Sequence, residues 1–194
     1  MALKPWNEAE SAGLTEKFLA ETYGVLFEPS DIIDATLAPS IASTIAALPS
    51  DALPKSYSDL IDLAMKDIAT WEDSERAVFI SGHPRIGEVS NLSALSAAEQ
   101  ASKQTPPEVL ARLEYLNDQY EKAFPGLRFI TFVNGRSRAE IIPEMEGLLG
   151  FAPGEEAGVG MNFPGTDEWN GELERAVKDV GLIAKARVKG MGLE

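Results

Sequence analysis

The chain has 194 residues, of which 44% are hydrophobic, and its 31 acidic and 17 basic residues give a formal net charge of -14. A charge of this sign repels nucleic acid and anionic membranes unless a local basic patch overrides it, and no such patch is visible in the sequence. The absence of cysteine excludes disulfides, thiolate nucleophiles and cysteine-based metal sites, and it fits a reducing compartment. We therefore expect neither nucleic acid nor a membrane among the partners.

The two ends of the chain bear on localisation. Residues 1–6 lack the apolar run of a signal peptide, and no apolar stretch elsewhere is long enough to span a membrane, so we expect a cytoplasmic protein. If the final Leu193-Glu194 is a cloning remnant, a peroxisomal address could be lost beneath it, which makes the peroxisome the alternative. No Ser/Gly-rich or proline-rich tract resembles an interdomain linker, so residues 1–194 are predicted to form a single domain.

Apolar residues recur at helical spacing from the beginning of the chain. Residues 14–23 predict one helix and residues 32–37 a second, with Pro29 and Pro39 marking breaks between helical segments. Most of the sequence has this helical periodicity rather than the alternation of a strand.

The two clearest helical patterns lie further along the chain. Residues 58–71 repeat apolar side chains at three- and four-residue steps, and Ser58 is available as the N-cap. A second helix is predicted to begin at Pro106, with Glu108 completing a capping box and an apolar stripe over residues 109–124.

The last third of the chain adds an extended run and two helices. Residues 129–133 are β-branched and aromatic but have no convincing partner strand, so we expect extended chain without a sheet. Ser137 is predicted to cap a helix in which Pro143 requires a start or a bend. The Gly/Pro-rich residues 150–168 predict a mobile loop, and residues 167–188 a final helix. The fold class expected is an all-α single-domain bundle of about seven to nine helices with no substantial sheet.

His83 is the only histidine, and it lies between Gly82 and Pro84. One imidazole that titrates near neutral pH is a natural candidate for proton transfer. Against this, a solitary histidine is often a surface residue or a hydrogen-bonded structural one. Because Pro84 restricts His83 to extended conformations and Gly82 allows a close turn, the ring is predicted to project from a defined loop.

Two further positions allow both a structural and a functional interpretation. Ser96 and Glu99 have the spacing of a capping box, yet a helix N-terminus can also bind an anionic ligand. Arg187 lies beside the apolar stripe of the last helix, where it can either extend its head into water or present a fork to a carboxylate. The two interpretations stay open for both positions.

Recognisable cofactor and metal motifs are absent from the sequence. With one histidine and no cysteine, a metal would need an all-carboxylate site, and the acidic residues look scattered over solvent-facing positions. There is no P-loop, no credible dinucleotide fingerprint and no nucleophile elbow. Catalysis, if the chain is an enzyme, is expected to be cofactor-free acid–base chemistry.

In order and spacing, several segments together resemble the 2-oxo-4-hydroxy-4-carboxy-5-ureidoimidazoline (OHCU) decarboxylase family, which completes the conversion of urate to (S)-allantoin. The resemblance extends from Leu14 to about Gly190, and its most specific part is the histidine-proline pair followed by Ser-x-x-Glu-Gln. The segments that carry it are His83-Pro84, residues 96–100, residues 116–120 with Phe124, residues 129–133, residues 135–137 and residues 183–188.

The resemblance implies an all-helical homodimeric carboxy-lyase that needs no cofactor and acts on a small-molecule ureidoimidazoline. It implies that His83 is the catalytic acid–base group and that the serine, glutamate and glutamine of the later motif bind substrate. The substrate-binding residues it implies are Pro84, Ser96, Glu99, Gln100, the main chain of Phe129, Ile130, Thr131, Phe132 and Val133, and Arg187.

Three features depart from the family pattern. Arg85 stands where some members carry aspartate, residues 124–129 are one residue longer than usual, and residues 150–168 resemble an insertion. The competing hypothesis is a catalytically silent helical binding or scaffold protein that keeps the fold. The joint presence of His83, Glu99 and Gln100 favours the enzyme.

Overall fold

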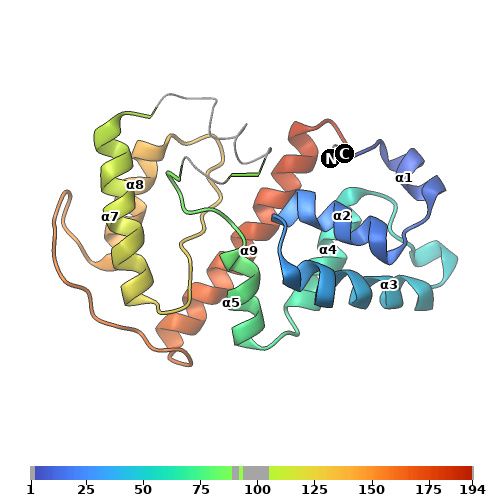
Figure 1. The fold of residues 1–194 in the computed structure, drawn as a ribbon, viewed down its shortest axis with the longest axis horizontal. Helices are drawn as coiled ribbons and strands as arrows, with labels where there is room; N and C mark the ends of the chain where they lie inside the picture. The colour runs from blue at the N-terminus through green and yellow to red at the C-terminus, as the bar shows by residue number, and fades with distance from the viewer. Residues whose placement is uncertain (1–2, 89–91, 94–104, 194) are drawn as a thin grey trace. The chain divides into compact units, whose positions relative to one another are not determined.

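The computed structural model describes residues 3–88, 92–93 and 105–193. Over these residues the chain forms eight α-helices and no strand, so the predicted all-α fold is confirmed (Figure 1). In chain order the helices are α1 (Trp6–Ala12), α2 (Glu16–Phe27), α3 (Ala38–Ala47), α4 (Tyr57–Ile68), α5 (Asp73–Ser81), α7 (Pro107–Ala123), α8 (Arg138–Leu149) and α9 (Asp167–Gly190), with a π-helical segment at Ile33–Leu37 and a 3₁₀ turn at Ser50–Ala52.

The chain divides into two compact units. One consists of Met1–Gly82 with Lys178–Glu194, and the other of His83–Val177. Helix α9 contributes its first part to the second unit and its remainder to the first. The prediction that residues 1–194 form a single domain stays a prediction.

The first unit has an aromatic and aliphatic core built around α2. Tyr23 and Phe27 stack with ring centroids 5.5 Å apart, and the Tyr23 hydroxyl donates to the carbonyl of Leu60 at 3.0 Å. Burial raises the pKa of the Tyr23 hydroxyl, with the charge of Asp67 adding to the shift, so the group stays a neutral donor. Buried residues from the other helices of the unit complete this core: Leu37, Ile41, Leu60, Ile61, Ala64, Ile68, Phe79, Val180, Ala184 and Val188.

Pro39 does not end a helix, contrary to the prediction. The N–H of Ala38 donates to the carbonyl of Ile33, one residue further back than in an α-helix, and α3 begins directly after this π segment. Pro39 therefore lies in the first turn of α3, where a missing N–H is tolerated. Pro29 does lie between helices, as predicted.

Two predicted helix starts are displaced by one or two residues. The N-cap of α4 is Ser56, whose side chain accepts from the N–H of Asp59 at 3.1 Å, and Ser58 is inside the helix. Helix α7 begins at Pro107 without a side-chain cap, so Pro106 is the N-cap residue and the predicted capping box with Glu108 does not form. The N-cap of α4 therefore lies two residues before the predicted one, and α7 begins one residue after its predicted start.

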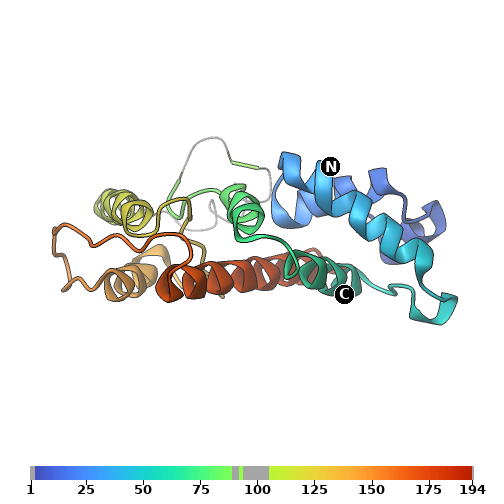
Figure 2. The ribbon, with the colours of Figure 1, turned by 90° about the horizontal axis from the view of Figure 1, so that it is seen from below.

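The second unit is built on α7 and α8, which lie side by side in both views (Figures 1 and 2). Ser137 caps α8 and forms a capping box with Glu140, and Pro143 lies inside the helix rather than at its start. The final helix α9 agrees with the predicted range. The buried apolar residues of this unit are Leu113, Leu116, Tyr120, Phe124, Leu127, Phe129, Ile130, Ile141, Met145, Trp169, Leu173 and Val177.

Residues 150–166, between α8 and α9, contain no helix, but hydrogen bonds connect them to α7. The Arg112 guanidinium donates to the carbonyl of Glu155 at 2.7 Å, the Tyr115 hydroxyl to the carbonyl of Ala157 at 3.1 Å, and the N–H of Asn162 to the carbonyl of Ala123 at 2.7 Å. The mobility predicted for residues 150–168 stays a prediction.

Among the described residues, no helix combines the length and the apolar character that crossing a membrane requires.

Candidate active site around His83

His83 comes directly after the C-cap of α5, a helix that was not predicted from the sequence. Glu72 caps this helix and forms a capping box with Glu75, and Gly82 is its C-cap residue. The next residue, His83, is 3% exposed. The prediction that the histidine lies in a loop is confirmed, and the alternative of a surface histidine is wrong. The capping box and the acidic first turn were the signals that could have located α5.

Residues 83–88, called here the His83 loop, contain a closed turn. The N–H of Glu88 donates to the carbonyl of Arg85 at 3.0 Å, and the N–H of Arg85 donates back to the Glu88 carboxylate at 2.9 Å. Gly87 has φ +87°, the conformation that a type II turn requires at this position. A Cβ atom on Gly87 would lie 3.2 Å from Cδ1 of Leu113, so the turn packs closely on α7.

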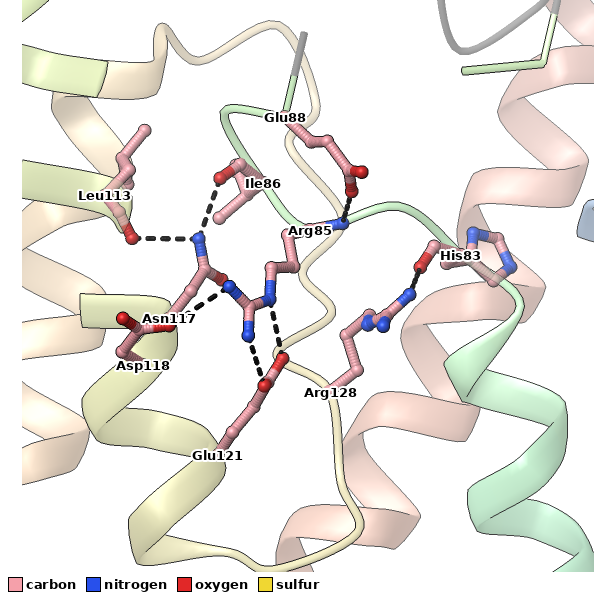
Figure 3. A network of polar contacts seen from close by, with 9 residues as sticks. All are labelled: His83, Arg85, Ile86, Glu88, Leu113, Asn117, Asp118, Glu121 and Arg128. Carbon is pink, nitrogen blue, oxygen red and sulfur yellow. Dashed lines mark hydrogen bonds and ion pairs between the residues drawn. The ribbon is translucent and has the colours of Figure 1, made fainter. Parts of the chain in front are cut away.

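Helix α7 holds the His83 loop through its side chains (Figure 3). The Asn117 amide, on a residue 2% exposed, donates to the carbonyl of Ile86 at 2.9 Å and to the carbonyl of Leu113 at 2.8 Å. Arg85 donates from Nε to Glu121 at 2.8 Å, pairs a second time with the same carboxylate through Nη2, and reaches Asp118 at 3.0 Å. The hydrogen bond to Glu121 raises the pKa of Arg85 most, against the opposing effect of desolvation.

A second cation holds the backbone of His83 itself. Arg128 Nη1 donates to the carbonyl of His83 at 2.5 Å (Figure 3). The position of the histidine backbone is therefore set from the segment after α7, while the adjoining turn is set from α7. Asn117, Glu121 and Arg128 were not predicted as site residues, because their role depends on contacts between segments about 30 to 45 residues apart.

The extended run at residues 129–133 is held by arginines through its carbonyl groups. Arg175 Nη1 donates to the carbonyl of Ile130 at 2.6 Å. Arg136 donates to the carbonyl of Phe132 at 2.9 Å and to that of Val133 at 3.0 Å. The run forms no strand in the described chain, as predicted. Phe129, Ile130 and Thr131 are buried, whereas Phe132 and Val133 are partly exposed.

A buried polar group supports this run. The Tyr120 hydroxyl donates to Glu172 at 2.7 Å, and Glu172 also accepts from Arg175 at 2.5 and 2.8 Å. The Arg175 guanidinium lies over the ring of Phe129, 5.2 Å from its centroid. Burial, followed by the charge of Glu172, raises the pKa of Tyr120, so its hydroxyl remains protonated and donating.

Arg187 belongs to the first unit, whereas His83 and the extended run belong to the second. Its guanidinium donates to Glu28 at 2.5 Å and to the carbonyl of Leu26 at 3.1 Å, and the side chain is 3% exposed. The interpretation of a head extended into water is therefore wrong. The guanidinium satisfies a carbonyl in the last turn of α2, where a cation is also favoured by the helix dipole.

The remaining predicted site residues divide into two groups. Pro84 lies in the His83 loop and is partly exposed. Ser96, Glu99 and Gln100 lie outside the described residues, so their predicted substrate contacts stay predictions. Among the residues that are described, no group of three histidine, cysteine or acidic side chains could hold a metal ion.

Chemically, the arrangement presents one buried imidazole on a loop whose backbone is fixed at several points. Such an imidazole can move a proton with little reorganisation, because its position is set before a substrate arrives.

A family model described as OHCU decarboxylase matches residues 13–162. The matched range includes the His83 loop, α7, the extended run and α8, while α9 with Arg187 lies beyond it. No curated protein matched the chain.

Proposed function

Because the chain belongs to the OHCU decarboxylase family, whose reaction is a decarboxylation in urate degradation, we propose that it converts 2-oxo-4-hydroxy-4-carboxy-5-ureidoimidazoline to (S)-allantoin without a cofactor. The single observation that supports this most is the buried, backbone-anchored position of the only histidine. In this proposal His83 is the acid–base catalyst of a carboxy-lyase.

The substrate itself makes cofactor-free chemistry feasible. Its carboxylate is attached next to a C=N bond, so the electron pair left by the departing CO₂ moves into the ring and ureido system. The bond between C4 and the carboxylate breaks, CO₂ leaves, and the ring nitrogen that receives the electron pair takes up one proton. The 4-hydroxyl then becomes a carbonyl as its proton is transferred to C5, the carbon that becomes the stereocentre. The enzyme must therefore hold the substrate and control proton movement.

His83 is suited to both proton transfers. It accepts the proton of the 4-hydroxyl and then protonates the intermediate on one face, which gives a single stereoisomer. Its burial keeps bulk water away from the intermediate, since protonation by water would not select a face.

Substrate binding is assigned to the residues implied by the family. Ser96, Glu99 and Gln100 bind the substrate, with Glu99 accepting ureido or ring N–H groups. Pro84 and the main chain of residues 129–133 contact the same substrate. Hydrogen bonds from Arg175 and Arg136 to three carbonyls of this run keep its main chain rigid. The substrate contact that the family implies for Arg187 stays a prediction, because its guanidinium donates to Glu28 and to the carbonyl of Leu26 within the first unit.

We further propose that the protein is a cytoplasmic homodimer. The competing function, a helical scaffold that has lost activity, shares the fold and differs only in the outcome of an assay.

The test uses substrate generated freshly from urate by urate oxidase and hydroxyisourate hydrolase. Circular dichroism follows the appearance of (S)-allantoin with and without this protein. The proposal predicts a clear acceleration over spontaneous decay and a single enantiomer. Decay at the spontaneous rate in the presence of folded protein would reject the decarboxylase and favour the scaffold.

A further inference from the structure

Arg85 and Glu121 form a contact that the proposed function does not use. Two nitrogens of the Arg85 guanidinium face the two carboxylate oxygens of Glu121, and a third reaches Asp118 (Figure 3). Paired contacts of this kind fix orientation as well as distance, because both groups are planar.

We propose that Glu121, acting through Arg85, is a positioning residue for His83. The inference rests on the proposed function, in which His83 carries the proton transfers. The ion pair holds Arg85 on α7 and, together with the bond from Arg128 to the carbonyl of His83, sets where the imidazole lies.

The covalent connection between Arg85 and His83 is short and stiff. Only Pro84 separates Arg85 from His83, and a proline ring holds its own φ near −65° while restricting the residue before it. A displacement of Arg85 is therefore passed to the backbone of His83 rather than absorbed by the chain between them.

Other contacts limit how far the loop can move when this pair is lost. Arg128 still holds the carbonyl of His83, and Asn117 still holds that of Ile86. Loss of Glu121 should therefore shift the imidazole instead of releasing the loop. A small misplacement of a catalytic group lowers turnover by about tenfold to a hundredfold, so we expect about tenfold here.

The same pair contributes little to the stability of the whole protein. The side chains of Arg85 and Glu121 are 34% and 30% exposed, and solvent-screened ion pairs of this kind are weak. An effect on turnover can for this reason be separated from an effect on folding.

The first experiment is a double-mutant cycle with Arg85→Gln, Glu121→Gln and both together. Each single variant is expected to lower kcat about tenfold with KM changed less than about twofold, and the double variant to be no slower than the slower single variant. Unchanged kcat in Glu121→Gln would overturn the proposal. So would a rise in KM confined to the Arg85 variants, because Arg85 would then bind substrate directly.

The second experiment observes His83 without any substrate. Because the chain has one histidine, the imidazole signals in an NMR spectrum of the ¹⁵N-labelled protein belong to His83 alone. They are expected to shift, and their titration midpoint to move, in Glu121→Gln. Identical signals in the variant and the wild type would contradict the positioning role.

The matched control is Glu146→Gln. Glu146 also binds an arginine of α7, Arg112 at 2.7 Å, but it accepts in addition from the N–H of Gly154 instead of holding the His83 loop. This variant should leave kcat and the imidazole signals unchanged even where it lowers the melting temperature. A wild type without decarboxylase activity whose imidazole signals still respond to Glu121→Gln would overturn the proposed function alone, since the positioning contact would stand.

Discussion

His83 combines a buried side chain with a held carbonyl. The residue is 3% exposed, and Arg128 binds its carbonyl at 2.5 Å. Fixing a catalytic group in this way removes conformational freedom before the substrate binds, so less free energy is lost when the transition state forms. In the mechanism proposed above, His83 is therefore a rigid acid–base group rather than one carried by a moving loop.

Gly87 offers a test of that rigidity. Gly87→Ala places a Cβ on a backbone with φ +87° and 3.2 Å from Leu113, so the free energy of unfolding should fall by roughly 1 to 2 kcal/mol. We also expect kcat to fall, because the turn of the His83 loop must move away from α7. Urea denaturation and the allantoin assay measure the two effects.

The control for this variant is Gly165→Ala. Gly165 has nearly the same φ, +91°, but an added Cβ meets nothing within 4 Å. Its backbone penalty should be similar while kcat stays that of the wild type. Equal kcat in the two variants would argue against a link between the turn and His83.

At the scale of single residues, the sequence predicted that His83 lies in a loop but not which side chains hold that loop in place. Gly82 and Pro84 are local signals, and they placed His83 correctly between helices. Asn117, Glu121 and Arg128 act on residues far away in the chain, and no local pattern encodes such a contact. Arg187 shows the same limit, since its buried partner Glu28 is 159 residues away.

Among the elements, α7 binds the His83 loop and α8 through different side chains. Asn117 and Glu121 bind the His83 loop, and Arg112 binds Glu146 of α8. Burial raises the pKa of the Glu146 carboxyl, but the Gly154 N–H and the Arg112 guanidinium outweigh it, so the net pKa lies below its ordinary value of 4.5.

This shift predicts how stability depends on pH. A carboxyl whose folded pKa is depressed stabilises the protein above its unfolded pKa, and the contribution is lost as pH falls through the folded pKa. Glu146→Gln removes a charge-assisted hydrogen bond and should lower the free energy of unfolding by roughly 1 to 2 kcal/mol at neutral pH. The difference from wild type should shrink below about pH 4.5, because the folded-state pKa is depressed. Urea denaturation across this pH range measures it.

The comparison variant is Glu155→Gln. Glu155 is exposed and caps only a local turn, accepting from the N–H of Ala152 at 2.7 Å, so its loss should change stability little at any pH. A stability difference for Glu146→Gln that did not vary with pH would show that the charge of Glu146 is not the source of its effect.

Long helices were predictable and short ones were not. The apolar stripes of α4 and α9 span several turns, so the spacing of apolar residues identifies both helices. The predicted ends are less accurate: Ser58 was expected as the N-cap of α4, and the N-cap is Ser56. Helices α1 and α5 have seven and nine residues, too few for a periodic pattern to emerge. The π segment before Pro39 was missed because sequence rules treat proline as a helix end.

For the whole molecule, the all-α fold and the family match both agree with the proposed decarboxylase activity. The matched residues 13–162 include the His83 loop and the side chains of Asn117, Glu121 and Arg128 that hold it. The net charge of -14 is the basis for expecting a small-molecule ligand rather than nucleic acid. The central claim is that this family's decarboxylation proceeds here through proton transfer by His83.

The most direct test compares wild type with His83→Gln in the circular dichroism assay on fresh substrate, at matched folded concentrations. Glutamine can still form hydrogen bonds but cannot transfer a proton near neutral pH, so (S)-allantoin formation should slow by at least about a hundredfold while the melting temperature changes little. Turnover by His83→Gln close to that of the wild type would contradict the account.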